Sequence, residues 1–198
     1  MPDFELEKQA LAKGYKFICG VDEAGRGPLA GPVCAAAVIL NSDVELPGVN
    51  DSKKLSEKKR EALFDVICQK AVAYSIAFAS VEEIEEHNIL NATYLAMNRA
   101  IEGLETKADF ALIDGNRVPI DIKVDCETVV KGDAKSLSIA AASILAKVTR
   151  DRLLLEYHKQ YPQYNFAKHK GYGTAEHMDA IRKYGISEVH RPSFLKKL

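Results

Sequence analysis

Apolar runs bounded by turn residues recur along the chain and predict a set of strands. The runs over residues 15–21 and 33–40 are separated by a Gly- and Pro-rich connection of the kind that reverses the chain, so we expect these two strands to pair antiparallel. Later runs over 74–79, 110–113 and 126–130 predict three further strands. Together these runs supply the strands of one sheet.

Apolar residues at helical spacing occupy the segments between and after these strands. The expected helices cover 56–70, 80–103 in two consecutive stretches, 138–161 as a long amphipathic helix, and 174–185. Ser80 and Glu83 form the pattern of a capping box at the start of the second region. Strands that come first and then alternate with helices favour an α/β fold, with a mixed central β-sheet flanked by helices and a C-terminal helical segment.

The length of 198 residues, with 47% hydrophobic and 28% charged residues, fits one well-buried domain. We expect a single domain over 1–198, in which about 150–198 is a C-terminal helical extension packed on the rest. The longest apolar run, 33–40, is far too short to span a bilayer, and the acidic N-terminus lacks the apolar core of a signal peptide. Four cysteines without a C-x-x-C pair indicate reduced thiols. These features predict a cytoplasmic protein.

The net charge of −1 conceals an uneven distribution along the chain. Residues 1–146 contain 16 Lys and Arg against 23 Asp and Glu, whereas residues 147–198 contain 11 against 5, together with four of the five histidines. A positive C-terminal part is compatible with a polyanionic partner, and a solvated helix face would give the same count. Charge alone does not distinguish these two interpretations.

Four acidic residues are expected at or after the carboxyl ends of buried strands: Asp22, Glu23, Asp114 and Asp133. If the strands over 15–21 and 110–113 are parallel neighbours, their spacing of about 4.8 Å sets Asp22 and Asp114 at a distance that one metal ion can bridge. A buried cluster of like charges is costly without a cation to neutralise it. The cluster therefore predicts two divalent ions, either Mg²⁺ or Mn²⁺.

Each acidic segment also has an ordinary interpretation as a turn. Asp22 and Glu23 stand just before Gly25, and adjacent strand residues point to opposite faces, so both reach one site only where the strand ends or bulges. The Asp-Gly pair at 114–115 fits a type I′ hairpin turn. The Lys-Gly-Asp segment at 131–133 is likewise compatible with a turn. From these residues alone, both interpretations stay open.

The segment Gly25, Arg26 and Gly27 follows the first two acids directly. Glycines let backbone N–H groups approach a ligand closely, and an arginine side chain pairs with an anion. A dinucleotide-binding loop is excluded, because Pro28 and Pro32 interrupt the glycine pattern and the next element is a strand. With the neighbouring acids, the segment indicates metal-assisted chemistry on a phosphate.

Two further polar segments are candidates for binding a nucleic acid. Ser52, Lys53 and Lys54 can contact backbone phosphates, although the same residues are also typical of helix capping beside a solvated charge run. Tyr172 lies between two glycines in a basic loop with Lys170, where it has few neighbours to pack on and its ring can stack on a sugar or a base. A packing role for this tyrosine also stays open.

Taken together, these segments resemble the bacterial ribonuclease HII family, the type 2 ribonucleases H. The matching stretches follow the family's order and lie at 20–28, 50–56, 112–116, 130–133, 141–151 and 169–172. The resemblance implies a ribonuclease H-like fold and an endonuclease that cuts the RNA strand of RNA/DNA hybrids. It also implies cleavage at a single ribonucleotide embedded in duplex DNA, leaving 3′-hydroxyl and 5′-phosphate ends.

The resemblance also implies roles for individual residues. The acids Asp22, Glu23, Asp114 and Asp133 match the metal-site positions of the family. Residues 25–27 match the loop that reads the 2′-hydroxyl through backbone groups, and Tyr172 matches the tyrosine that stacks on the sugar beside the junction. Phosphates would be held by Lys53, Lys147 and Lys170.

Two alternatives remain at this stage. Ribonuclease HIII usually has an extra N-terminal domain and lacks an arginine between the two glycines, whereas here about 14 residues precede the first strand and Arg26 is present. A hybrid-binding module, with the acids around a structural cation, is the non-enzymatic alternative. The tail over 190–198 shows no sliding-clamp box, and a monomer is expected.

Overall fold

A five-stranded mixed sheet forms the centre of the computed structural model, which describes residues 1–50 and 52–196. The strands are β1 Ile18–Ala24, β2 Val33–Ile39, β3 Ala73–Ala79, β4 Phe110–Asp114 and β5 Asp125–Val129. Their order across the sheet is β3-β2-β1-β4-β5, with β1 antiparallel to β2 and parallel to β4. The expected mixed sheet and the antiparallel first pair are confirmed.

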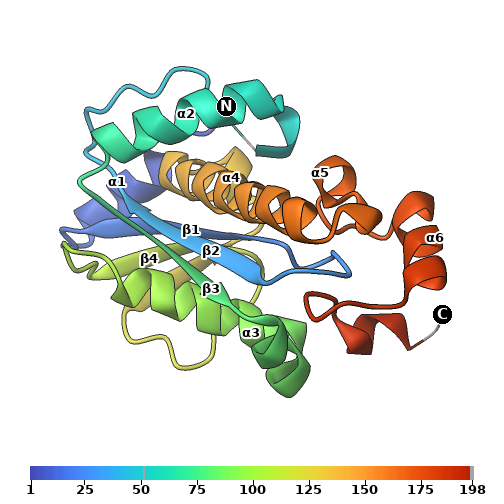
Figure 1. Cartoon of the computed structure of the whole chain (residues 1–198). Helices are drawn as coiled ribbons and strands as arrows, with labels where there is room; N and C mark the ends of the chain where they lie inside the picture. The colour runs from blue at the N-terminus through green and yellow to red at the C-terminus, as the bar shows by residue number, and fades with distance from the viewer. Residues whose placement is uncertain (51, 197–198) are drawn as a thin grey trace.

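Helices cover both faces of this sheet, as Figure 1 shows: α2 and α4 lie on one face and α3 on the other. The helices are α1 Glu5–Ala12, α2 Glu57–Lys70, α3 Val81–Glu102, α4 Leu137–Gln160, α5 Phe166–His169 and α6 Ala175–Tyr184. Short 3₁₀ turns are η1 Ser52–Lys54, η2 Gly132–Ala134, η3 Pro162–Tyr164 and η4 Pro192–Leu195. The capping box is present, since Ser80 accepts from the Glu83 N–H and the Glu83 carboxylate accepts from the Ser80 N–H.

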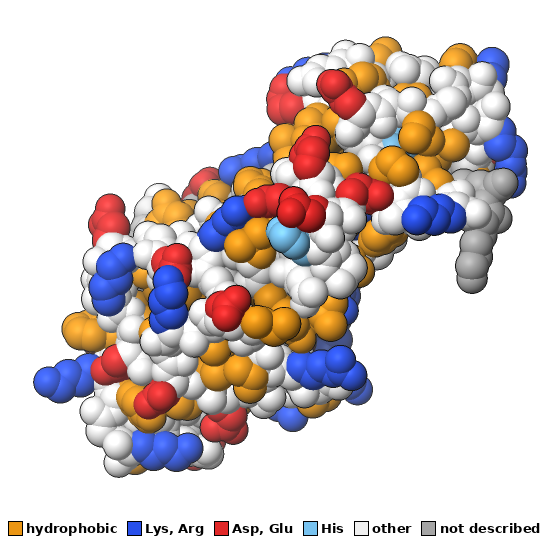
Figure 2. Space-filling view, turned by 90° about the horizontal axis from the view of Figure 1, so that it is seen from below, with side chains coloured by type: hydrophobic (Ala, Val, Ile, Leu, Met, Phe, Trp, Pro, Cys, Tyr) orange, Lys and Arg blue, Asp and Glu red, His pale blue; other side chains and the backbone are white. Residues whose placement is uncertain are grey.

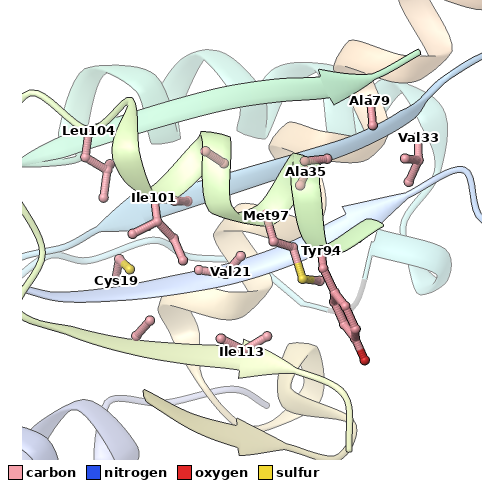
Figure 3. Packing of buried hydrophobic residues seen from close by; sticks show 14 of the residues in the cluster. Cys19, Val21, Val33, Ala35, Ala79, Tyr94, Met97, Ile101, Leu104 and Ile113 are labelled. Atoms are coloured by element: carbon pink, nitrogen blue, oxygen red, sulfur yellow. The ribbon is translucent and has the colours of Figure 1, made fainter. Parts of the chain in front are cut away.

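Helix α3 packs on the sheet through an apolar cluster. Figure 3 shows Met97 and Ile101 of α3 lying over Val21 of β1 and Ile113 of β4, all nearly inaccessible to solvent. Asn88, with φ 65°, breaks the helical conformation inside α3, in agreement with the two consecutive stretches expected there. On the α3 face of the sheet, Ile113 is the last residue of β4 in this apolar cluster, and Asp114 follows it directly.

Helix α4 differs from its expected amphipathic character. Every residue over 137–146 is buried, because this half of the helix lies between the sheet and α2. Gly20 of β1 permits the close approach: a Cβ at this position would lie 2.1 Å from the carbonyl carbon of Ser138. In the part of the chain that the structure describes, no helix is both long and apolar enough to cross a membrane, α4 included.

Several expected boundaries are wrong in ways that affect the site. Strand β1 begins later than expected and continues through Ala24, and β5 ends at Val129, so Asp133 lies in η2 rather than at a strand end. The hairpin interpretation of 114–115 is also wrong, since β4 and β5 are parallel.

Helix α1 was not expected; its Glu7 is buried and accepts hydrogen bonds from the hydroxyls of Ser136 and Ser138.

The C-terminal segment packs on the connection between β1 and β2. Tyr164, Phe166 and Ile181 form an apolar cluster with Ala30 of that connection and Leu154 of α4. In Figure 1 this segment, coloured orange to red, lies beyond the carboxyl end of β1. The packing brings the loop over 169–174 next to the segment over 25–31.

Candidate active site

Asp22 and Asp114 are placed together by the parallel pairing of β1 with β4. Val21 is the partner of Ile113 in the register, so the two aspartates occupy the next position on each strand. Neighbouring strands are about 4.8 Å apart, which allows the two carboxyl groups to share one ligand. The expected neighbourhood of these two acids is therefore confirmed.

Asp22 and Glu23 leave β1 toward opposite faces of the sheet, because β1 continues past them without a bulge. Asp22 is 5% exposed and lies near Ser143 of α4, which lowers the pKa of Asp22 against the effect of burial. Glu23 lines a cavity of about 230 Å³ on the α3 side, together with Tyr94 and Asp114. The end of β4 thus lies between two carboxylates that approach it from different sides.

The pKa of both β1 acids is raised. Burial raises the pKa of Asp22 well above its usual range, and the charges of Glu23 and Asp114 raise it further. Burial also raises the pKa of Glu23, which Asp114 raises as well, while Arg26 and Lys53 oppose the shift. Like charges held in a desolvated place favour a bound cation, which would offset the repulsion.

Asp133 approaches the cluster through the turn after β5. The Gly132 N–H donates to Oδ1 of Asp114 over 2.6 Å, which ties η2 to the end of β4. Lys131 takes a left-handed conformation, with φ 56°, to make this turn, and Asp133 is 8% exposed. Asp133 is therefore the direct chain neighbour of Gly132, the residue that is hydrogen-bonded to Asp114.

The donor set fits a hard divalent ion, since it consists of carboxylate oxygens alone. The arrangement is not a finished metal site, because within residues 1–50 and 52–196 no group of three His, Cys, Asp or Glu side chains is placed to hold an ion. Asp22 and Glu23 leave β1 on opposite faces, so side chains of the cluster would have to move closer together before three of the acids could hold one ion. The four acids are thus compatible with metal binding in chemistry and in position.

The segment over 25–31 is fixed by a buried arginine from the C-terminal end of the chain. Arg191 is fully buried and donates hydrogen bonds of 2.6–3.1 Å to main-chain carbonyls of this segment. The acceptors are Gly25, Arg26, Pro28 and Gly31. With its carbonyls engaged in this way, the segment keeps a defined backbone geometry next to the acids.

A second buried arginine, Arg150 of α4, joins the connection between β1 and β2 to the loop over 169–174. It donates to the carbonyl oxygens of Ala30 and Pro32 at 2.9 and 3.1 Å, and to that of Lys170 at 3.1 Å. Neither Arg150 nor Arg191 was assigned a role from the sequence. Nothing in the local pattern distinguishes them from solvated arginines, because their acceptors are main-chain carbonyls far away in the sequence.

Tyr172 lies beside the segment over 25–31, which we call the glycine segment, and its side chain is open to solvent. The ring is half-exposed, Lys147 Nζ lies 5.9 Å from its centroid, and a Cβ on Gly27 would come within 3.7 Å of it. Arg26 is exposed and its guanidinium lies 3.6 Å from the Glu23 carboxylate. Of the expected substrate-binding residues, Gly27, Lys147 and Tyr172 therefore lie together, and Arg26 lies beside Glu23.

Ser52 and Lys170 are engaged within the protein more than a phosphate-contacting role suggests. Ser52 is 3% exposed, and its hydroxyl lies 2.8 Å from that of Ser143, so it joins η1 to α4 behind Asp22. Lys170 donates to the Ala167 carbonyl and lies 4.0 Å from Glu57. Lys53 differs, since its charge lowers the pKa of Glu23 and it therefore lies near the acids.

Comparisons with known proteins agree on one family. A family model described as ribonuclease HII matches residues 19–197. Ribonuclease HII of Caldicellulosiruptor bescii is 54% identical over 195 residues, which is 98% of this chain and 94% of the relative. The crystal structure of ribonuclease H2 from Pyrococcus horikoshii OT3 has a TM-score of 0.77 at 27% identity, covering 90% of this chain and 93% of that one.

A more distant structure shares the fold alone. Bst-RNase HIII in complex with Mn²⁺ has a TM-score of 0.60 at 19% identity, and the match covers 85% of this chain and 63% of that one. The ribonuclease H-like fold expected from the sequence is thus confirmed by both structural relatives.

Proposed function

This chain belongs to the ribonuclease HII family, and we propose that Asp22, Glu23, Asp114 and Asp133 form its metal-dependent active site. Membership makes the protein an endonuclease of the ribonuclease H type, which acts on the RNA strand of RNA/DNA hybrids and uses divalent metal ions. The observation that supports the assignment of the site is the β1–β4 register, which sets Asp22 beside Asp114. The raised pKa of Asp22 and of Glu23 supports it independently.

Two divalent ions, Mg²⁺ or Mn²⁺, are the proposed cofactors. When bound, such ions activate a water molecule and stabilise the leaving 3′-oxygen of an in-line displacement. The Mn²⁺ bound to Bst-RNase HIII, a protein of the same fold, is consistent with this choice. The four carboxylates would hold the ions, and no side chain of the chain has to act as nucleophile.

Substrate selection is proposed to depend on the segment over 25–27 and on Tyr172. The 2′-hydroxyl is the local chemical difference between ribose and deoxyribose, so main-chain groups of 25–27 would read it. The exposed ring of Tyr172, close to Gly27, would stack on the sugar beside the junction. Lys53, Lys147 and Lys170 would contact phosphates, and Ser52 would support this surface from beneath.

Replacing Asp114→Asn tests the assignment. Asn keeps the oxygen that accepts from the Gly132 N–H but removes the charge, so the fold should persist while cleavage falls at least about 100-fold. The measurement is cleavage of a duplex with one embedded ribonucleotide, at fixed Mg²⁺ or Mn²⁺. Glu127→Gln on β5, an exposed acid paired with Lys13, is the matched control and should retain full activity.

Retained activity in Asp114→Asn would contradict the proposed site. Comparing substrates tests the finer specificity, since efficient cutting at a lone ribonucleotide is the proposal. Good cutting of long hybrids without cutting at a lone ribonucleotide would instead favour a specificity like the one expected of ribonuclease HIII. Binding of hybrids without metal-dependent cleavage would contradict both.

A further inference from the structure

Three buried histidines lie directly behind Tyr172. His169, His177 and His190 are 7%, 0% and 1% exposed, and they come from α5, from α6 and from the segment before η4. The His169 and His177 rings stack with centroids 4.4 Å apart, and Tyr164 of η3 packs edge-on against His177 and His190. Each of these imidazoles has a hydrogen-bonding partner at both ring nitrogens.

The partners determine which ring nitrogen carries the proton. The Ser187 N–H can only donate, and it lies 3.0 Å from Nδ1 of His190, so this nitrogen is unprotonated. The proton of neutral His190 is then on Nε2, which lies 3.1 Å from Nε2 of His177 and donates to it. His177 must therefore carry its own proton on Nδ1, 2.9 Å from the main-chain oxygen of Tyr172.

The result is a directed relay of hydrogen bonds that ends at the carbonyl of Tyr172. The same residue is held from its other side, because its N–H donates to the carbonyl of His169 over 2.9 Å. His169 is also in a defined tautomer: its Nδ1 accepts from the Gly171 N–H, so its Nε2–H donates to Tyr164. The main chain of Tyr172 is thus fixed, while its ring stays open to solvent.

We propose that His177 and His190 are positioning residues for Tyr172: their relay holds the main chain from which the aromatic ring projects toward the junction sugar. The inference rests on the substrate role proposed above for Tyr172. Both rings are buried, and their hydrogen bonds join them to each other, to Ser187 and to the main chain of Tyr172. Their effect on cleavage therefore passes through the orientation of one side chain.

The chemistry of the cluster supports more than a packing role. Burial lowers the pKa of His177, and burial together with the neighbouring His177 lowers that of His190 to about 4, so both rings are neutral near pH 7. Neutral imidazoles buried in this way are tolerated because every ring nitrogen is bonded. His190 is followed directly by Arg191, so one short segment holds both the Tyr172 loop and the glycine segment over 25–31.

A double-mutant cycle in kcat/KM tests the relay. His177→Leu removes the side-chain donor to the Tyr172 carbonyl and leaves the Thr174 N–H as its main-chain donor, and we expect a loss of about tenfold or more on a single-ribonucleotide duplex. His177→Asn keeps an N–H near the Nδ1 position and should recover most of that loss. In a Tyr172→Ala background, His177→Leu should change the rate by less than about twofold, because residues acting through one another are not additive.

Controls separate positioning from stability. His87→Asn, at an exposed histidine of α3, should leave kcat/KM unchanged. Circular dichroism and thermal melts identify any variant that does not fold. If His177→Leu fails to fold, the cycle is run with His190→Leu against His190→Gln, because glutamine can keep the donor toward His177.

Three results would overturn the inference. One is an equal loss from His177→Leu in the parent protein and in the Tyr172→Ala background, and another is no recovery in His177→Asn. The third is full activity of Tyr172→Ala itself, which would also remove the proposed role of that tyrosine. In each case cleavage by the parent protein and its loss in Asp114→Asn would still stand, so failure of the relay is distinguishable from failure of the active-site proposal.

Discussion

Single residues of the glycine segment have different tasks, although the sequence shows them as a matched pair. Gly25 has φ 100°, and a Cβ there would lie 2.1 Å from Nε of Arg150. Gly27 has an ordinary φ, and its Cβ would meet only the ring of Tyr172, at a normal contact distance of 3.7 Å. The need for glycine at 25 is therefore structural and depends on an arginine 125 positions later in the numbering.

Alanine substitutions at these two positions should separate the two tasks. Gly25→Ala should lower the free energy of unfolding by about 1–3 kcal/mol, because it adds both backbone strain and overlap with a buried guanidinium. Gly27→Ala should change it by less than about 0.5 kcal/mol. Urea unfolding followed by circular dichroism measures both. Equal stabilities of the two variants would contradict the proposed strain at Gly25.

Elements that follow from local signals could be predicted from the sequence, and those that depend on distant partners could not. The Ser56 cap of α2 and the box at Ser80 depend on neighbouring residues, and the structure contains both. Burial on all sides of the first half of α4 depends on its place between sheet and α2. The same reason applies to α1, whose Glu7 is bound by hydroxyls more than 120 positions away.

The residues of the candidate site also fall into two groups: those that local sequence signals could place, and those that depend on distant partners. Asp22 and Asp114 could be placed side by side from the sequence, because each follows an apolar run and parallel neighbours align their carboxyl ends. The roles of Arg150 and Arg191 could not be assigned from the sequence. Apart from the bond between Arg150 and Lys170, their carbonyl acceptors are more than 100 residues away along the chain. Tertiary hydrogen bonds to the main chain leave no periodic pattern in a sequence.

The histidines that join α5, α6 and the segment before η4 should make stability fall in acid. Burial lowers the pKa of His190 to about 4 in the folded protein, whereas an unfolded histidine titrates near 6.5. Below about pH 6.5 the unfolded chain binds the extra proton, so this contribution to stability is complete above that pH and is lost as the pH falls. For His190 alone the loss between pH 7.5 and 5 is about 2 kcal/mol.

Comparing the parent protein with His190→Gln isolates this contribution. Burial raises the pKa of Asp22 and Glu23, and their protonation in acid therefore acts in the opposite direction. Both proteins contain these acids, so the difference between their urea unfolding free energies removes that term. The difference should shrink by about 2 kcal/mol from pH 7.5 to 5. A constant difference across this range would show that His190 is not held neutral.

At the scale of the whole molecule, an exposed acidic group and the lysines proposed to contact phosphates lie on different elements. Acidic residues gather at the start of α3, where Glu82, Glu85 and Glu86 are exposed, and Figure 2 shows a group of red side chains beside a histidine on the face seen from below. The residues proposed to contact phosphates lie elsewhere, on η1, α4 and the loop after α5. We therefore expect the hybrid to lie along the carboxyl edge of β1 and β4, away from the acidic start of α3.

This placement predicts how binding responds to salt. Each phosphate contact that a lysine makes contributes close to one unit to the slope of log K against log salt concentration, because counterions are released on binding. Lys147 lies beside the Tyr172 ring, and Lys147→Gln is introduced into the catalytically inactive Asp114→Asn protein. This change should weaken binding of the hybrid and reduce the magnitude of the salt slope by about 1. Lys107→Gln is the matched control, because it precedes β4 at the end of the strand opposite Asp114. Equal slopes for the two lysine variants would contradict a phosphate contact at Lys147.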